Sequence, residues 1–284
     1  MDIYSRIADL RQEVGQVKKT GQRIGFVPTM GSLHKGHLSL VSKAVQENDF
    51  VVVSIFVNPT QFGPKEDYDS YPRDLESDAA KLGALDVDCI FSPDTTEMYP
   101  EGYNSYVMVK GISEKLCGSS RPGHFKGVTT VVTKLFNIIQ PNIAYFGEKD
   151  YQQLMVIKRM VKDLNMPIEI KGISIVREED GLALSSRNKY LNIEERKQAT
   201  ILNRSLLKAK ELILEKELKD VNKIKKEIVE MIERQPLAII DYIEIVDLET
   251  LGDIQFIEDK VLVALAVYFG VTRLIDNIVI NINY

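Results

Sequence analysis

Short apolar runs rich in β-branched residues alternate with helical patterns from Arg23 to about Val176. Such runs, bounded by turn residues, predict buried strands, and apolar positions at helical spacing predict helices. Strands are expected at residues 23–27, 50–57, 87–91, 142–146 and 168–176, and helices at 37–48, 73–84 and 127–140. This alternation predicts an α/β fold with a Rossmann-like parallel sheet, helices on both faces, and ligands beyond the carboxyl ends of the strands.

The alternation stops near residue 178, which predicts a second domain. Two charged amphipathic helices are expected within residues 194–235, followed by strands at 240–248 and 261–269. We therefore predict a Rossmann-like domain over 1–177 and a smaller C-terminal α+β domain over 178–284. The first residues have apolar positions at helical spacing and an acid at position 2, which indicates an amphipathic helix and not a signal peptide.

The charge and the cysteine content of the chain argue against some classes of partner and indicate its redox environment. The 284 residues include 36 basic and 41 acidic side chains, so no single-sign field indicates a nucleic-acid or membrane partner. The most apolar stretch, 261–271, is shorter than the ~20 residues that a bilayer span needs. Cys89 and Cys117 are too few for a disulfide framework, which predicts reduced thiols and a cytoplasmic location.

Two of the three histidines, His34 and His37, lie three positions apart after a predicted strand. A zinc site is one explanation, but the further soft ligands are few: His124 and two scattered cysteines. A structural cap or a packed histidine is the second. The third is an anion site, in which the turn and the positive end of a helix bind phosphate, imidazoles add donors, and Gly36 lets a nucleotide come close.

The segment HKGH at 34–37 has the H-x-G-H form of the nucleotidyl-transferase superfamily related to class I aminoacyl-tRNA synthetases. With its neighbouring motifs, the chain resembles the pantothenate synthetase family. The motifs follow the family's order at PTMGSLHKGH (28–37), FVNPTQF (56–62), YPRDLESD (71–78), SSRPGHFKGV (119–128), YFGEKDYQQ (145–153) and LALSSRN (182–188). The resemblance therefore covers the whole predicted Rossmann-like domain. It implies that this domain is the catalytic one and binds ATP and pantoate, with the C-terminal domain as a lid.

This resemblance implies an enzyme that joins (R)-pantoate to β-alanine with ATP and Mg²⁺. The implied route passes through a pantoyl-adenylate, with release of pyrophosphate and then AMP. The expected partners are these small molecules, without nucleic acid or membrane, and a second copy of the chain in a homodimer. No feature of the sequence itself indicates the dimer.

The resemblance implies four catalytic residues, His34, His37, Lys149 and Arg187, which surround the triphosphate together with Ser186. An ammonium and a planar guanidinium suit phosphate oxygens, although either could be an ordinary surface charge. Four implied residues lie near the nucleoside: Met30, Gly147, Asp150 and Val176. The full implied ATP site is Met30, Gly31, Ser32, Leu33, His34, Lys35, Gly36, His37, Gly147, Glu148, Lys149, Asp150, Val176, Leu184, Ser185, Ser186 and Arg187.

A small acid with two hydroxyl groups needs amide partners when it is buried. The resemblance places Gln61 and Gln153 on pantoate, and Gln61 also on β-alanine. The other implied pantoate contacts are Asn58, Val131, Val132 and Arg121. The alternative for Asn58 is a turn former before proline. The alternative for the two valines is core packing, and that for Arg121 is a structural turn. Asp78 is the candidate contact for Mg²⁺, with an exposed helix acid as the alternative, since phosphates should hold most of the ion.

Some alternatives stay open at this point. The sequence names no base for the β-alanine amine, and it does not separate proton donation by His37 from electrostatic stabilisation. Three rival functions are another adenylyl transferase of the superfamily, an aminoacyl-tRNA synthetase and a non-catalytic ATP sensor. Another adenylyl transferase would need extra basic residues for an acceptor phosphate, and an aminoacyl-tRNA synthetase would need a basic surface for tRNA. An ATP sensor would have no use for an acid pocket lined with amides.

Overall fold

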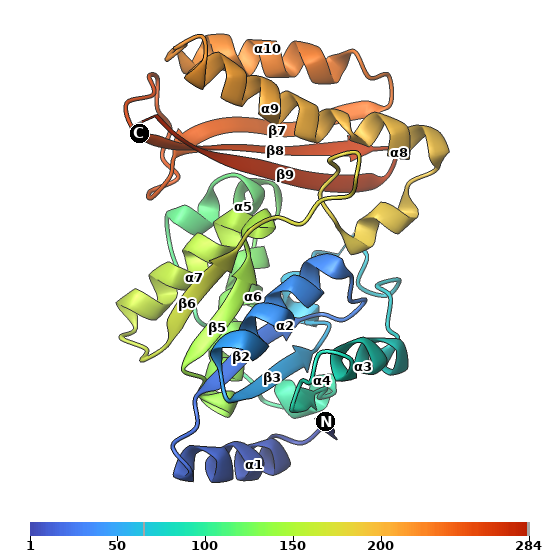
Figure 1. Cartoon of the computed structure of the whole chain (residues 1–284), viewed down its shortest axis with the longest axis vertical. Coiled ribbons are helices and arrows are strands. Elements are labelled where there is room, and N and C mark those ends of the chain that lie inside the picture. The colour runs from blue at the N-terminus through green and yellow to red at the C-terminus, as the bar shows by residue number, and fades with distance from the viewer. Residues whose placement is uncertain (65, 283–284) are drawn as a thin grey trace. The chain divides into compact units, whose positions relative to one another are not determined.

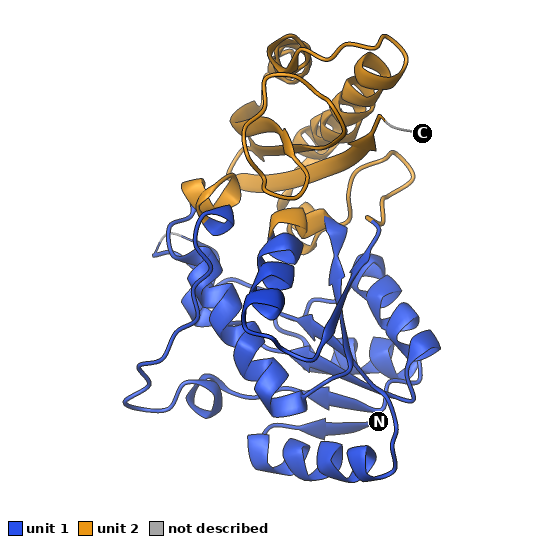
Figure 2. Ribbon diagram, turned by 90° about the vertical axis from the view of Figure 1, so that its left-hand side faces the viewer, with its two compact units in different colours: residues 1–113, 121–148, 153–174 blue, residues 114–120, 149–152, 175–284 orange. Residues whose placement is uncertain are grey.

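The computed structural model describes residues 1–64 and 66–282, and the chain divides into two compact units (Figure 2). Unit 1 comprises Met1–Ser113, Arg121–Glu148 and Gln153–Ser174. Unit 2 comprises Glu114–Ser120, Lys149–Gln152 and the chain from Ile175 onward. Two short segments, before and after the long helix of unit 1, therefore belong to the C-terminal unit.

Unit 1 is built on one six-stranded sheet in the order β1-β4-β3-β2-β5-β6 (Figure 1). Its strands are β1 (Asp2–Tyr4), β2 (Ile24–Thr29), β3 (Phe50–Ile55), β4 (Cys89–Phe91), β5 (Ile143–Gly147) and β6 (Glu169–Ile173), and neighbouring strands are parallel. The five strands predicted from apolar runs are confirmed. The edge strand β1 was not predicted, because three residues are too few for a period-two pattern.

Helices cover both faces of this sheet, which confirms the predicted α/β architecture. They include α1 (Ile7–Lys19), α2 (Lys35–Glu47), α3 (Leu75–Gly83), α6 (His124–Ile139) and α7 (Tyr151–Asp163), with a short α4 (Thr95–Met98). On one face, Val41 of α2 belongs to the same buried cluster as Val53 of β3. On the other, the ring of Phe136 in α6 stands edge-on to Phe26 of β2 at 6.3 Å.

The strand order reverses between β2 and β5, which lie side by side at the centre of the sheet. In parallel sheets, ligands bind outside the carboxyl ends of the strands at such a reversal. The segment after β2 begins with Met30, and the segment after β5 begins with Glu148. The topology therefore starts two of the implied ATP-binding segments at the reversal.

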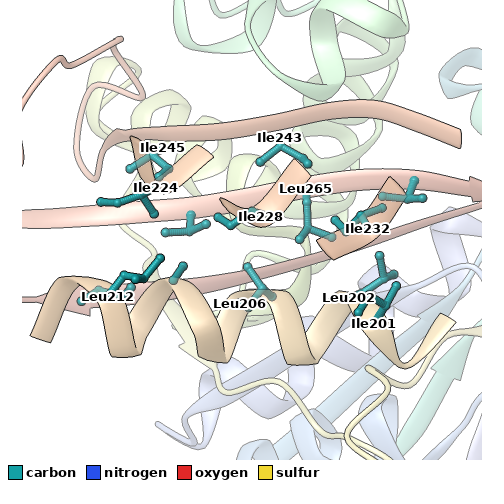
Figure 3. Packing of buried hydrophobic residues seen from close by; sticks show 14 of the residues in the cluster. Ile201, Leu202, Leu206, Leu212, Ile224, Ile228, Ile232, Ile243, Ile245 and Leu265 are labelled. Carbon is teal, nitrogen blue, oxygen red and sulfur yellow. The ribbon is translucent and has the colours of Figure 1, made fainter. Parts of the chain in front are cut away.

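Unit 2 carries a separate antiparallel sheet in the order β7-β8-β9. Its elements are α5 (Cys117–Ser120), α8 (Ile193–Ala199), α9 (Ile201–Leu214), α10 (Val221–Glu233), β7 (Ala238–Asp247), β8 (Lys260–Phe269) and β9 (Thr272–Asn281). Figure 3 shows Leu206 of α9 and Ile228 of α10 meeting Leu265 of β8 in one apolar core. The predicted α+β character is confirmed, and the structure adds α8 and β9.

Candidate active site

The turn between β2 and α2 carries the histidine motif. Gly31 and Ser32 have φ values of 82° and 52°, so the chain turns in the left-handed region directly after β2. The Gly31 N–H donates to Thr29 Oγ1 at 3.2 Å, and that hydroxyl donates to the Ser54 carbonyl of β3 at 2.7 Å. A Cβ atom on Gly31 would come within 3.1 Å of the Asp78 carboxylate. Glycine is therefore required both for its backbone conformation and for space.

The two imidazoles cap α2 reciprocally. His34 is the N-cap residue, and its Nδ1 accepts the Gly36 N–H at 3.1 Å, while His37 Nδ1 accepts the His34 N–H at 3.4 Å. The ring centroids lie 4.1 Å apart with a tilt of 32°. Because each Nδ1 is an acceptor, the proton of each neutral ring is on Nε2. The structural cap considered from the sequence is thus present, and it uses only Nδ1. The cap lies at the positive end of a 13-residue helix, which favours binding of a phosphate.

Leu33, the residue before the motif, is held by two side chains of α3. Its N–H donates to Asp78 Oδ1 at 2.8 Å, and its carbonyl accepts from Lys81 Nζ at 3.1 Å. Asp78 is 1% exposed, and its Oδ2 has no hydrogen-bond partner among the described residues. The structure therefore makes Asp78 a buried support of the turn that leads to the histidine motif, in place of the exposed helix acid considered from the sequence.

Asn58 supports the loop that carries Gln61. It is 1% exposed, and its amide donates to Gln61 Oε1 at 3.1 Å and to the Gly127 carbonyl at 3.2 Å, while Tyr99 donates to its Oδ1 at 2.8 Å. These contacts occupy the polar atoms of Asn58, so it orients Gln61 from within the protein. Gln61 Nε2 lies 2.9 Å from Met30 Sδ. One residue implied for pantoate and one implied for ATP are therefore in direct contact.

Arg121 is bonded to another side chain of the protein. Its guanidinium makes two bonds of 2.6 Å to the Glu66 carboxylate and lies 3.2 Å from His124 Nε2. Burial opposes the ionisation of Glu66, but the bonds from Arg121 hold the pKa of Glu66 below its ordinary value. The expectation that Arg121 contacts pantoate stays a prediction.

The remaining residues implied for pantoate lie on two helices of unit 1. Val131 and Val132 of α6 are 6% and 4% exposed, so the core packing considered from the sequence accounts for both. Gln153 is part-buried and lies in the first turn of α7, a helix whose first two residues belong to unit 2.

The Arg187 segment of unit 2 follows a hairpin. The Val176 carbonyl accepts the Leu184 N–H at 3.0 Å, so the chain returns on itself before Ser185. Ser185 caps the short helix η4 (Ser186–Tyr190) by accepting the Arg187 N–H at 3.3 Å. The implied ATP residues from Leu184 to Arg187 therefore form one continuous piece that begins beside Val176.

Lys149 and Asp150 lie in the single turn η3 (Glu148–Asp150) that leads into α7, where the sequence predicted a helix start. They belong to unit 2, whereas Gly147 and Glu148 belong to unit 1. Asn277 Nδ2 of β9 donates to the Lys149 carbonyl at 2.8 Å, and Asp150 is exposed.

Sequence reasoning missed three supporting side chains: Lys81, Tyr99 and Asn277. Each contacts a site segment that is distant along the chain, and no local pattern marks such a contact. Asp78 had a usable signal, because it shares the helix face of Leu75 and Leu82, where a carboxylate is unusual.

Within 1–64 and 66–282, no three His, Cys, Asp or Glu side chains gather in a way that could hold a metal ion. In the same part of the chain, no helix has the length and apolar character needed to cross a membrane.

Comparison with known proteins identifies the family. The sequence pattern of the pantoate-beta-alanine ligase family matches residues 2–279. The chain belongs to this family. A pantothenate synthetase of Acetivibrio thermocellus is 58% identical over 282 residues, which are 99% of this chain and 100% of that relative. One from Carboxydothermus hydrogenoformans is 54% identical over 284 residues, 100% of both chains.

Solved structures of the pantoate-beta-alanine ligase family have the same fold. The crystal structure of pantothenate synthetase from Thermus thermophilus matches with a TM-score of 0.92 and 48% identity, covering 98% of this chain and 99% of that one. The Francisella tularensis pantoate-beta-alanine ligase, complexed with beta-gamma ATP and beta-alanine, matches with a TM-score of 0.79 and 41% identity over 98% and 97% of the two chains. The resemblance seen in the motifs is confirmed, and the chain is a ligase of this family.

Proposed function

We propose that this ligase condenses (R)-pantoate with β-alanine to give pantothenate, AMP and pyrophosphate, through a pantoyl-adenylate formed from ATP. The observation that carries the proposal is the pair His34 and His37, which caps α2 at the reversal of strand order in a member of the pantoate-beta-alanine ligase family. The ligands of the Francisella tularensis relative support ATP and β-alanine as substrates.

In the first half-reaction, a carboxylate oxygen of pantoate attacks the α-phosphorus of ATP. The new O–P bond forms as the bond to the β-phosphate bridging oxygen breaks, and pyrophosphate leaves with the electron pair. Two anions have to approach each other, so positive and N–H groups must offset their charge. We assign this role to His34 and His37 Nε2–H, the N-terminus of α2, Lys149, Ser186 and Arg187.

For pantoate, we propose direct contacts from the amides of Gln61 and Gln153, which can both donate and accept. Asn58 then contributes by holding Gln61 Oε1. Val131 and Val132 provide the apolar wall beside the dimethyl group. Because Arg121 is paired with Glu66, we propose that it supports the loop of Gln61, whose carbonyl also accepts from His124 at 2.8 Å.

In the second half-reaction, the β-alanine amine attacks the acyl carbon and AMP leaves. The main contribution of the protein is to hold the two reactants in line, with Gln61 also in contact with β-alanine, because positioning alone supplies effective molarities of ~10⁵ M or more. For His37 we propose hydrogen-bond donation to phosphate through Nε2. Its Nδ1 accepts the His34 N–H, so proton abstraction through Nδ1 would break the cap.

We propose that Mg²⁺ arrives bound to ATP, where it neutralises phosphate charge. Asp78 fits one contact at most: its Oδ2 is a buried oxygen to which no other described residue is bonded, and Oδ1 is already bonded to Leu33. The described residues form no metal-binding cluster around it. The phosphates and water would therefore supply most ligands.

We further propose the division into a catalytic domain at 1–177 and a lid domain at 178–284. Lys149 and Arg187 group with the C-terminal unit, whereas His34 and His37 group with the other, and this division into two units supports the proposed two domains. A homodimer is proposed from the family resemblance. Cys89 and Cys117 form no disulfide, which supports the proposed reducing, cytoplasmic location.

The test is exchange of labelled pyrophosphate into ATP, with (R)-pantoate and without amine, followed by amide formation once β-alanine is added. Both activities are expected, and His34→Ala, Lys149→Ala and Arg187→Ala should remove most of the exchange while the fold persists. Exchange that needs a different acid would point to another adenylyl transferase. ATP binding without any acid-dependent exchange would point to a sensor and overturn the proposal.

A further inference from the structure

Two consecutive residues of β9 hold two different segments of unit 2. Asp276 accepts bonds of 2.6 and 2.9 Å from the Arg177 guanidinium, and Asn277 Nδ2 donates to the Lys149 carbonyl at 2.8 Å. Arg177 lies at the start of the hairpin that leads to Ser185 and η4, and it also donates to the Gly181 carbonyl at 3.1 Å. One strand is therefore bonded to the turn that carries Lys149 and to the hairpin that precedes Ser186 and Arg187.

The two bonds leave opposite faces of the sheet. Successive side chains of a strand alternate, so Asp276 shares a face with Leu274 and Ile280, which belong to the apolar core. Asn277 points the other way, toward the Lys149 turn. The core thus fixes β9 from one side, and β9 fixes the main chain of Lys149 from the other.

Both residues are buried, at 2% and 6% exposed. A buried carboxylate or amide in a strand costs free energy unless it is bonded, and apolar residues would pack there without that cost. Asp276 Oδ1 also accepts the Asn277 N–H at 2.8 Å, so one carboxylate is bonded to both the Arg177 guanidinium and the main chain of Asn277. Strand stability alone does not account for this arrangement. A fixed distance between two functional segments does.

We propose that Asp276 and Asn277 are positioning residues for nucleotide binding: Asn277 acts through Lys149, and Asp276 acts through Arg177 on the segment of Arg187. The inference rests on the proposed roles of Lys149 and Arg187. It assigns no contact with substrate to either residue of β9. Their effect is to fix where the two cations stand relative to each other.

The test is a double-mutant cycle on ATP affinity. The dissociation constant of a non-hydrolysable ATP analogue is measured by calorimetry for the unmodified chain, Lys149→Ala, Asn277→Ala and the double variant. Loss of one hydrogen bond predicts a roughly three- to tenfold weakening for Asn277→Ala. In the Lys149→Ala background the same change should add less than about twofold, because its effect passes through the missing side chain. Asp276→Asn should likewise weaken affinity by itself, and it should add less than about twofold when Arg187→Ala is already present.

Two further variants separate positioning from folding. Asn277→Leu keeps most of the side-chain volume without the donor, and it should weaken the analogue as Asn277→Ala does. Ile280→Val, in the core of the same strand, should lower the thermal midpoint and leave affinity unchanged. If Asn277→Ala and Lys149→Ala weaken affinity independently, Asn277 is only structural, and the proposed site stands without this inference. If Lys149→Ala leaves affinity unchanged, the proposed role of Lys149 and the inference both fail.

Discussion

Gly127 of α6 lies directly against the main chain of Thr60 and Gln61. A Cβ atom on Gly127 would meet the Thr60 carbonyl and come within 2.6 Å of the Gln61 nitrogen. Asn58 bonds to the Gly127 carbonyl from the same loop, so the helix and the loop are fixed at this short separation. Only glycine permits so close an approach between two backbones.

Gly127→Ala should therefore displace Gln61. Overpacking of this kind costs about 1–3 kcal/mol of stability, and a displacement near 1 Å can lower a rate by about 10²-fold. We expect kcat/KM for (R)-pantoate to fall by at least about tenfold, with a smaller change for ATP. Steady-state kinetics in each substrate and thermal unfolding measure the two effects.

Gly15→Ala is the matched control, because Gly15 lies in the interior of α1 and nothing is within 4 Å of its added Cβ. This change should raise stability by roughly 0.5–1 kcal/mol and leave the kinetics as they are. Unaltered use of pantoate by Gly127→Ala would show that Gln61 does not depend on this contact.

His34→Asn should separate capping from phosphate binding. Asn is a favoured N-cap residue, and its Oδ1 can accept the Gly36 N–H in place of Nδ1, but no atom replaces the Nε2–H. The unfolding free energy should stay near that of the unmodified chain, while pyrophosphate exchange falls about 10²–10³-fold. His34→Ala should lose the same activity and about 1 kcal/mol of stability as well. Full exchange activity in His34→Asn would contradict the donor role.

The sequence predicted the central strands of unit 1 because buried parallel strands are nearly continuous apolar runs. It did not predict β9, where Arg273, Asp276 and Asn277 interrupt the apolar pattern. Each of these bonds to a residue far along the chain, as Arg273 does to Asp241 at 2.8 Å. A single-sequence pattern contains no information about such partners.

The candidate site also has a part that the sequence could predict and a part that it could not. The turn at His34 could be predicted, because strand, glycine turn and helix start follow one another locally. The support of Gln61 by Asn58 could not, since it needs Gly127 and Tyr99 from other parts of the chain. The pairing of Arg121 with Glu66 likewise depends on contacts between separate loops.

Asp78→Ala tests whether α3 holds the turn between β2 and α2 in place. The Leu33 N–H would lose its partner, which costs about 1–3 kcal/mol, and the turn before His34 would loosen. We expect KM for ATP to rise several-fold together with the loss of stability. Chemical denaturation and ATP-dependent exchange rates measure these changes.

Asp88→Ala serves as the control for Asp78→Ala. Asp88 Oδ2 accepts the Val51 N–H at 2.7 Å near the start of β3, at the end of the sheet opposite to the histidine turn. A comparable loss of stability is expected, with KM for ATP unchanged. A similar rise of KM in both variants would reduce the role of Asp78 to general stability.

Glu47 joins the far end of α2 to β5 and β6. Its carboxylate accepts from Lys171 at 2.9 Å, from Lys43 at 2.9 Å and from the hydroxyl of the buried Tyr145 at 2.8 Å. These bonds lower the pKa of Glu47 from 4.5 to about 2. The pKa of Tyr145 is raised, mainly by burial and then by its hydrogen bond to Glu47. The helix that presents His34 is thus anchored at its other end by an ionised carboxylate.

The depressed pKa fixes the sign of a pH dependence. A group with a lowered folded-state pKa contributes stability above its unfolded value, and that contribution is lost as pH falls from about 4.5 to about 2. Glu47→Gln should therefore be less stable than the unmodified chain at pH 7, and the difference in denaturation midpoint should shrink across this window. Glu169→Gln is the control: Glu169 lies 3.6 Å from the same Lys171 with half of its side chain exposed, so its removal should change little. A Glu47→Gln deficit that persists unchanged at pH 2 would mean that packing, and not the charge, anchors the end of α2.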